Sequence, residues 1–206
     1  MAPIQDRPLE RDDLVPDPLA QFARWYEEAR ERGAYEPDAM ALATVAASGA
    51  PSLRMVLMKG FDEGGIGFYT NYGSRKGREL DANPSAALLF HWPELGRQVR
   101  VEGRAARVDR AESVAYAHSR SRASQLSALA SPQSRPVPSR EWLEQRVAAL
   151  DGEYPAGDLP VSEEWGGYRL MPEAWEFWQH RPNRLHDRFR YELVTGWAWS
   201  IERLGP

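Results

Sequence analysis

Residues 54–80 read RMVLMKGFDEGGIGFYTNYGSRKGREL, a pattern of short β-prone runs, turn residues and one polar helix. The β-prone runs cover residues 52–61 and 66–72, and the DEGG between them is typical of a hairpin turn. Residues 74–83 then predict a short helix that Ser74 caps and that ends before a proline. Strands joined by so tight a turn indicate antiparallel pairing.

The flanking sequence extends this pattern in both directions. Asp17 and Pro18 have the order of an N-cap and a first helical residue, and Gly33 marks the end of that helix. Asp109 and Glu112 resemble a capping box at the start of a later helix. Further strands are predicted over 39–46, 85–92, 97–108 and in runs after residue 165. One or two helices are predicted over 110–131, and another over 140–150. Many short strands with inserted helices predict an α+β fold, mostly antiparallel β, in the form of a barrel.

Length, charge and composition limit the class of protein. The 206 residues suffice for one core, and we predict a flexible N-terminal arm over 1–15 and a single domain over 16–206. The net charge of −4 gives no general attraction to nucleic acid or to anionic membranes. The absence of cysteine excludes disulfides, thiolate catalysis and cysteine-based metal sites. A polar N-terminus and the lack of a ~20-residue apolar run predict a cytoplasmic protein that does not span a membrane.

Several common catalytic motifs are missing from the sequence. It contains no glycine-rich dinucleotide motif between a strand and a helix, no Walker A sequence, no Gly-x-Ser-x-Gly elbow and no His-Glu-x-x-His. The four histidines show no metal-ligand spacing, so no metal site is predicted.

Two polar groups of residues are candidates for binding an anion. Ser74, Arg75 and Lys76 open a helix where its dipole disfavours cations, a conflict that a bound anion would resolve. Tyr116, Arg120 and Ser124 share one face if the helix predicted over 110–131 is continuous, and they offer donors for three phosphate oxygens. Solvated surface helices explain both groups as well, and this alternative stays open.

Residues 184–193, RLHDRFRYEL, read as a strand with alternating faces. Alternation would place Arg184, His186 and Arg188 on one face, with about 6.6 Å between successive members. Such charges repel one another unless carboxylates or a ligand anion lie opposite. One interpretation is an outward face balanced by neighbouring glutamates. The other is a site for a planar aromatic ligand with anionic groups, which Trp178 would contact.

Taken together, these segments resemble the pyridoxamine 5′-phosphate oxidase family. Residues 54–80 are similar to its flavin-binding core, and the closing R-L-H-D-R-F is specific to this family among flavin-binding split barrels. Other similar segments follow in the same order at 97–103, 115–125, 165–170 and 176–191. The resemblance implies an FMN-binding split β-barrel with flanking helices, assembled as a homodimer with FMN at the subunit interface.

The resemblance also implies an activity and a set of site residues. The activity is FMN-dependent oxidation of pyridoxamine and pyridoxine 5′-phosphate by O₂ to pyridoxal 5′-phosphate, which releases H₂O₂, in vitamin B6 biosynthesis and salvage. The implied flavin contacts are Arg54, Met55, Val56, Leu57, Met58, Lys59, Tyr69, Thr70, Arg75, Lys76, Gln98, Gln133, Ser134, Trp178 and Arg188. The implied substrate contacts are Lys59, Tyr116, Arg120 and Ser124 at the phosphate and Arg184, Leu185 and His186 at the ring, with Arg184 and His186 as the catalytic pair.

Some features depart from the family pattern, and two alternatives remain. Arg54 and Lys59 have opposite strand parity, so a bulge or a strand end must bring both to ligands. The N-terminal arm has no tyrosine, which predicts a shortened or different lid over the substrate. The alternatives are a flavin oxidase of the phenazine-pathway type and a non-catalytic protein that binds FMN or pyridoxal phosphate.

Overall fold

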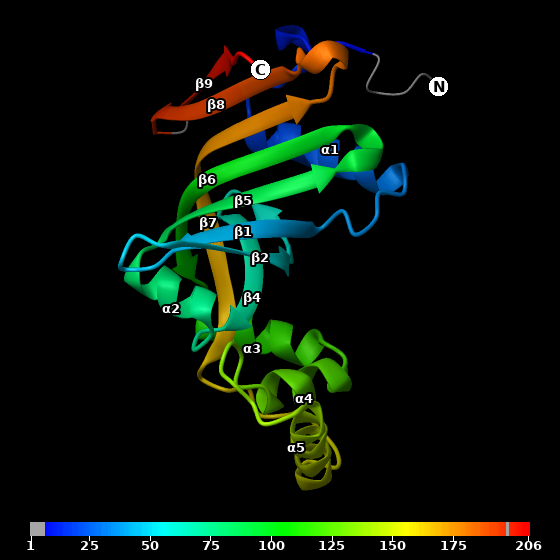
Figure 1. Cartoon of the computed structure of the whole chain (residues 1–206), viewed down its shortest axis with the longest axis vertical. Helices are drawn as coiled ribbons and strands as arrows, with labels where there is room; N and C mark the ends of the chain where they lie inside the picture. The colour runs from blue at the N-terminus through cyan, green and yellow to red at the C-terminus, as the bar shows by residue number, and fades with distance from the viewer. Residues whose placement is uncertain (1–6, 197) are drawn as a thin grey trace.

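The computed structural model describes residues 7–196 and 198–206, and its described strands form one antiparallel sheet (Figure 1). The strand order is β2-β1-β5-β6-β7-β4-β3, with β8 paired to β7 and β9 to β8. The strands are β1 (Ala39–Val45), β2 (Pro51–Leu57), β3 (Phe61–Asp62), β4 (Gly65–Asn71), β5 (Ser85–Trp92), β6 (Arg97–Arg107), β7 (Trp165–Gln179), β8 (Asp187–Thr195) and β9 (Ala198–Arg203). The sheet curves but does not close, so the predicted α+β, mostly antiparallel fold is confirmed as an open, split barrel.

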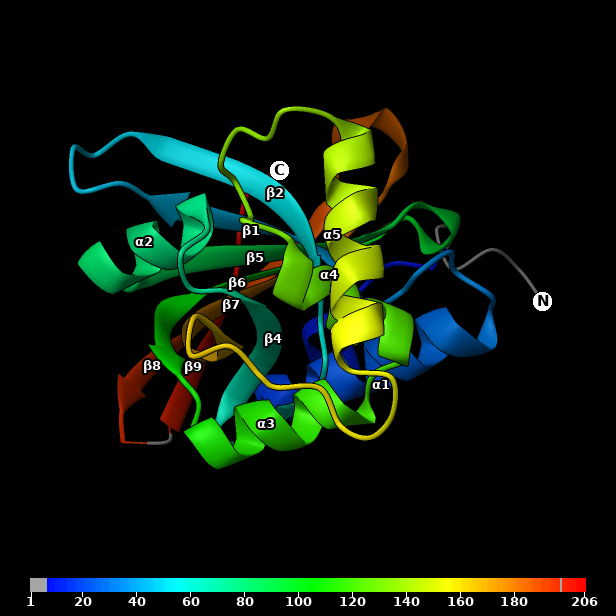
Figure 2. The same ribbon diagram turned by 90° about the horizontal axis from the view of Figure 1, so that it is seen from below.

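Helices cover two parts of this sheet (Figures 1 and 2). The α-helices are α1 (Pro18–Glu31), α2 (Arg75–Ala82), α3 (Arg110–Ser119), α4 (Arg122–Ala130) and α5 (Arg140–Glu153), and short 3₁₀ turns lie at Arg11–Asp13, Pro93–Leu95 and Pro182–Arg184. Helix α1 packs on the sheet, whereas α3, α4 and α5 gather at the end where β7 begins. None of the described helices is long and apolar enough to cross a membrane.

Helix α1 supplies the centre of the core. The Asp17 carboxylate accepts from the backbone N–H groups of Leu19 and Ala20 at 3.0 and 3.3 Å, which confirms the predicted N-cap. Phe22 is completely buried, and its ring centroid lies 4.9 Å from that of Phe90 and 5.5 Å from that of Trp175. The helix therefore joins the central strands β5 and β7 through one aromatic side chain.

The β-prone run predicted over 52–61 forms two strands, β2 and β3, and the predicted cap of α2 is confirmed. Strand β2 ends at Leu57, so Lys59 lies beyond it, where its backbone N–H donates to the Gly67 carbonyl at 2.8 Å. A strand end, not a bulge, thus explains the opposite parity of Arg54 and Lys59. The Ser74 hydroxyl accepts from the Gly77 N–H and caps α2.

The sequence predicts one or two helices over 110–131, and the structure has two, α3 and α4. Arg120 has an extended backbone, and the chain restarts as α4 because the Ser121 hydroxyl accepts from the Ser124 N–H. Asp109 makes no side-chain capping bond, and Glu112 instead accepts from the Tyr69 hydroxyl at 3.2 Å. Tyr116, Arg120 and Ser124 therefore do not share a helix face.

The strand predicted from residue 184 also begins later than expected. A 3₁₀ turn occupies Pro182–Arg184, in which Asn183 and Arg184 have φ angles of 59° and 63°, and β8 starts at Asp187. Arg184 and His186 precede the strand, so the alternation that placed them on one face with Arg188 was wrong. The proline explains the difference, because it favours a turn at this point.

The predicted N-terminal arm falls partly outside the described residues, which begin at Arg7. From there the chain packs against β8 and its neighbours: Leu9 and Leu14 are buried, and the Leu9 N–H donates to the Asp187 carboxylate at 3.0 Å. The Tyr191 hydroxyl donates to the Val15 carbonyl at 2.9 Å. Residues 7–15 are thus tied to the segment that carries the family's R-L-H-D-R-F sequence.

Replacing Phe22 with alanine is expected to lower the free energy of unfolding by about 3–5 kcal/mol, because it leaves a cavity between α1 and two central strands. Urea denaturation measures this change. The matched control is Tyr35→Ala at an 80% exposed position, for which a change within about 0.5 kcal/mol is expected. Equal effects of the two substitutions would contradict the central place of Phe22 in the core.

Candidate functional site

Many of the expected site residues fall into two groups, near the two ends of β7. One group includes residues around Trp165 at the start of β7, and the other includes residues around Trp178 near its end. These two tryptophans are thirteen positions apart on the strand, which corresponds to about 43 Å measured along an extended chain. The two groups are therefore separated along the length of this strand.

The group near Trp165 contains a buried lysine with neutral partners. The Lys76 Nζ donates to Thr70 Oγ1 at 3.0 Å and to Gln133 Oε1 at 3.1 Å, and Thr70 also donates to Gln133 at 2.9 Å. Burial lowers the pKa of Lys76, and the nearby charge of Arg54 lowers it further. The Lys76 ammonium group therefore brings together three expected flavin contacts. Thr70 comes from β4, Lys76 from α2, and Gln133 from the loop after α4.

Glu79 links two further expected flavin contacts, and the sequence analysis missed it. Its buried carboxylate accepts from Arg54 Nη2 at 3.2 Å and from Arg75 Nε at 2.8 Å. It also accepts from the hydroxyls of Thr44 and Ser52, each at 2.5 Å. Burial raises the pKa of Glu79, but these hydrogen bonds outweigh it and lower that pKa to about 2.

An aromatic stack positions two of the expected phosphate ligands. The rings of Tyr69 and Tyr116 stack with centroids 3.8 Å apart, and Trp165 extends the stack, 5.6 Å from Tyr69. The Arg120 guanidinium lies 5.1 Å from the centroid of the Trp165 ring, a cation–π contact. Burial and the neighbouring Glu112 raise the pKa of Tyr69 to about 12.

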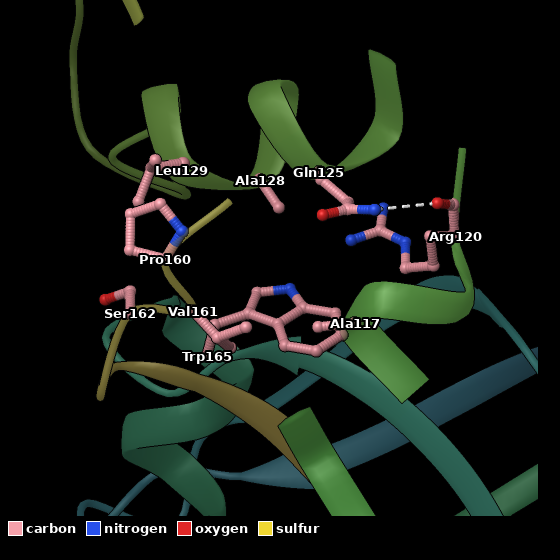
Figure 3. A pocket seen from close by; sticks show the side chains of 9 residues that line it. All are labelled: Ala117, Arg120, Gln125, Ala128, Leu129, Pro160, Val161, Ser162 and Trp165. Carbon is pink, nitrogen blue, oxygen red and sulfur yellow. Dashed lines mark hydrogen bonds between the residues drawn. The ribbon is translucent and has the colours of Figure 1, made fainter. Parts of the chain in front are cut away.

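Arg120 and Trp165 border a hollow between α3, α4 and the segment before β7 (Figure 3). Its empty volume is about 280 Å³, including space open to solvent. The Gln125 side chain donates to the Arg120 carbonyl at 2.8 Å and closes one side. The other lining residues are Ala117, Ala128, Leu129, Pro160, Val161 and Ser162. Trp165 was not expected in the site, and only its stacking partners reveal its role.

The remaining expected phosphate ligands lie apart from this stack. Ser124 bonds to Ser121 in the first turn of α4, with 2.9 Å between the two hydroxyl oxygens. The Lys59 ammonium lies 3.4 Å from the Asp38 carboxylate. Among the described residues, no hydrogen bond or ring contact joins Lys59 to Tyr116, Arg120 or Ser124.

The run 54–59 presents its side chains in two directions. Met55 and Leu57 are exposed, and so is Leu53 just before the run, whereas Met58 is buried in the core. The half-buried Val56 packs against that core. Met58 therefore has only its backbone to offer a ligand, and the outward apolar side chains form a stripe along the edge strand β2.

The group near Trp178 brings rings and cations together. The ring centroids of Trp178 and His186 are 4.6 Å apart, and His180 lies 5.2 Å from His186. The backbone N–H of Arg181 donates to His186 Nδ1 at 3.1 Å. Burial lowers the pKa of His186, and the charges of His180 and Arg184 lower it further. The histidine is thus held mainly neutral at neutral pH.

Other expected residues of this group differ in how they are held. Arg188 donates to Glu176 through Nε at 2.9 Å and through Nη2 at 3.1 Å, so a neighbouring glutamate balances it. Gln98 lies opposite Trp178 in the β6–β7 register. Arg184 and Leu185 are exposed at the turn before β8. Ser134, assigned to the flavin contacts, lies in the loop after α4 with a φ of 66°.

The curved, unclosed antiparallel sheet, with cations around the start of α2, places the protein in the class of split-barrel proteins. A solved structure from Nostoc punctiforme, a pyridoxamine 5′-phosphate oxidase-related FMN-binding protein, shows the same fold. It covers 94% of this chain, and this chain covers all of it, with a TM-score of 0.72 at 18% identity.

Sequence comparison narrows this class to a family. Residues 26–152 match the family model described as pyridoxamine 5′-phosphate oxidase, and residues 165–206 match the pyridoxine 5′-phosphate oxidase C-terminal dimerisation region. The pyridoxine/pyridoxamine 5′-phosphate oxidase of Rubrobacter xylanophilus is 56% identical over 96% of this chain and 91% of its own length. The enzyme of the same name from Gluconobacter oxydans is 52% identical, over 94% and 96%. The chain belongs to the pyridoxamine 5′-phosphate oxidase family.

One solved structure connects the fold to an alternative activity. PhzG from Burkholderia lata 383, in complex with tetrahydrophenazine-1-carboxylic acid, has a TM-score of 0.90 and 34% identity to this chain. The match covers 97% of this chain and 98% of PhzG.

Replacing His180 with alanine is expected to raise the pKa of His186 toward 6.5, the ordinary value for histidine, because a like charge is removed. In the unaltered protein, His186 therefore gains its proton at a lower pH than in the variant. Titration of the histidine ring protons by NMR measures the shift, with His91→Ala on an exposed part of β5 as the control. An unchanged titration of His186 in the His180 variant would contradict this electrostatic coupling.

Proposed function

We propose that this chain binds FMN and uses it to oxidise pyridoxamine and pyridoxine 5′-phosphate to pyridoxal 5′-phosphate, with O₂ as the electron acceptor. Family membership supports the reaction class. The structural observation that carries the proposal is Lys76, a buried cation whose partners among the described residues are the neutral Thr70 and Gln133. A buried charge needs an opposite charge nearby, and a phosphate group supplies it.

The residues around the start of α2 fit the phosphate of FMN. The exposed Arg75 binds Glu79 through Nε, which leaves the two Nη groups of its fork for an anion. Lys76 adds a second positive charge, and the N-terminus of the helix favours an anion. The donor set thus has both the charge and the geometry that a phosphate monoester requires.

The separation of the two residue groups supports a homodimer with the site between subunits. The match to a dimerisation region covers residues 165–206, which include Trp178, Arg184, His186 and Arg188. Strand β2, at the sheet edge, presents the exposed stripe Leu53, Met55 and Leu57 to a partner. In the proposed dimer, the group near Trp178 of one subunit faces the FMN-binding residues of the other.

The two groups of residues then have distinct tasks in the reaction. Lys59, Tyr116, Arg120 and Ser124 hold the substrate phosphate, while Arg184 and His186 orient the pyridine ring and stabilise developing charge. Because His186 Nδ1 accepts from the Arg181 N–H, the neutral ring carries its proton on Nε2. Bound FMN would supply the hydride acceptor and the route of electrons to O₂, with release of H₂O₂ and, from the amine substrate, ammonia.

Two other functions are distinguishable by experiment. The similarity to PhzG favours a phenazine-type flavin oxidase as the second candidate. A protein that stores FMN or pyridoxal phosphate would bind its ligand without turnover. A yellow protein that oxidises pyridoxamine phosphate under air would exclude storage. A preference for tetrahydrophenazine-1-carboxylic acid as substrate would favour the second candidate. We place the activity in the cytoplasm, which fractionation of the source cells would test.

Oxidation is expected to depend on the 5′-phosphate of the substrate. Two contacts to cationic ligands contribute about 1.5–3 kcal/mol each. Free pyridoxamine should therefore have a kcat/KM about two to four orders of magnitude below that of pyridoxamine phosphate. Steady-state oxidation under air measures both values. Specificity constants within tenfold of each other would remove the phosphate role from Lys59, Tyr116, Arg120 and Ser124.

Replacing Leu53 with glutamate is expected to convert the dimer to a monomer that loses FMN, because the substitution buries a charge in the apolar stripe of β2. Light scattering and the flavin absorbance of the same sample report mass and FMN content together. Tyr35→Glu, at another exposed hydrophobic position, is the control and should leave both unchanged. A dimeric Leu53→Glu protein with full FMN would place the interface elsewhere.

A further inference from the structure

Glu79 occupies an unusual place beside the expected FMN phosphate site, since it is a carboxylate where an anion is to bind. Its side chain is only 7% exposed and lies on the face of α2 that packs against β1. One oxygen, Oε2, accepts from Thr44, Ser52 and Arg54, and the other, Oε1, accepts from Arg75. A single carboxylate therefore bridges a strand arginine and a helix arginine.

The hydrogen bonds of Arg54 show how firmly this bridge is held. Its Nη1 donates to the Leu42 carbonyl at 3.0 Å and to Thr44 Oγ1 at 2.6 Å, while Nη2 donates to Ser52 and Glu79. Arg54 is thus fixed to β1 and to its own strand. Glu79 transmits this fixed position to Arg75, whose side chain is 58% exposed and has no other hydrogen bond among the described residues.

The geometry at Arg75 determines which of its donors face outward. A guanidinium is planar, and its Nη1–Nη2 edge lies on the side away from Nε. Because Glu79 holds Nε, the fork of Nη groups is left free to bind an anion with two parallel hydrogen bonds. Without Glu79, Arg75 would be a long side chain on a helix surface, and binding would have to order it.

We propose that Glu79 is a positioning residue for the FMN phosphate, which it serves by bridging Arg54 and Arg75 so that the Arg75 fork faces the anion. This inference rests on the proposed function, because it takes FMN as the ligand. If this inference is right, the presence of Glu79 strengthens the binding of the FMN phosphate, although the negative charge of Glu79 repels that anion.

Two possible roles of Glu79, repulsion of the phosphate by its charge and positioning of Arg75, predict opposite changes in FMN affinity for Glu79→Gln. If Glu79 acts only through its charge, its removal relieves repulsion and FMN binds more tightly. If Glu79 positions Arg75, the substitution leaves the Arg75 guanidinium without a fixed orientation, and FMN binds about tenfold more weakly. Riboflavin, which lacks the phosphate, should bind equally to both proteins, because the fork contacts the phosphate alone.

The experiment titrates the full-length apoprotein with FMN and with riboflavin and follows quenching of flavin fluorescence. The control is Asp81→Asn on the same helix, whose carboxylate binds Arg107 at 2.6 Å and touches none of the expected flavin contacts. We expect a tenfold loss for FMN in Glu79→Gln, no loss for riboflavin, and no loss for either ligand in Asp81→Asn. Equal or tighter FMN binding by Glu79→Gln, or an equal loss for riboflavin, would overturn the proposal.

Two further results separate this proposal from other failures. If the unaltered apoprotein binds no flavin, the proposed function fails, whereas normal binding with an unaffected Glu79→Gln variant overturns the positioning role alone. If Glu79→Gln does not fold, as its thermal unfolding would show, Ser52→Ala takes its place. That variant removes the hydrogen bond from Ser52 to Glu79 Oε2 and the one from Arg54 Nη2 to Ser52, both parts of the bridge, and should weaken FMN binding about threefold. An unchanged FMN affinity would again overturn the proposal.

Discussion

The long strand β7 connects two regions of the candidate site. Its first residues pair with β4, which carries Tyr69 and Thr70, and its last residues pair with β8, which carries Arg188. Strand β6 follows β7 along its length, with one shift between Glu102 and Gly103. At Gly103 a Cβ would lie only 2.0 Å from the Met171 carbonyl oxygen, so only glycine permits this approach. One long strand thus connects the region around Tyr69 and Thr70 with the region around Arg188.

Local chemistry made much of this fold predictable from the sequence. The Asp17 cap and the Ser74 cap depend on neighbouring residues, and the structure confirms both. The sequence analysis failed where two local preferences compete. Pro182 begins a turn in a stretch that alternates like a strand, so the strand predicted from residue 184 starts later. Over 110–131 the sequence left one or two helices open, and the Ser121 cap decides for two.

The places of Glu79 and Trp165 in the candidate site could not be predicted from the sequence. Each acts through partners that are distant in the sequence: Glu79 meets Thr44 and Ser52, and Trp165 meets Tyr69. No spacing rule connects a glutamate on a polar helix with hydroxyls on two strands, because their proximity follows from the packing of α2 on β1. The ionisable residues that we expect to bind ligands were identified through resemblance, whereas the residues that hold them appear only in three dimensions.

Charge balance explains why this support is needed. Arg54, Arg75 and Lys76 bring three positive charges to the region around the start of α2, and Glu79 is the carboxylate that bonds to two of them. Two positive charges remain, which matches the charge of a phosphate monoester dianion near neutral pH. A second carboxylate would neutralise the region further and weaken its attraction for phosphate. Without any carboxylate, Arg54 and Arg75 would repel each other, and nothing would orient the Arg75 fork. One buried carboxylate therefore reconciles a stable apoprotein with a strongly anion-binding surface.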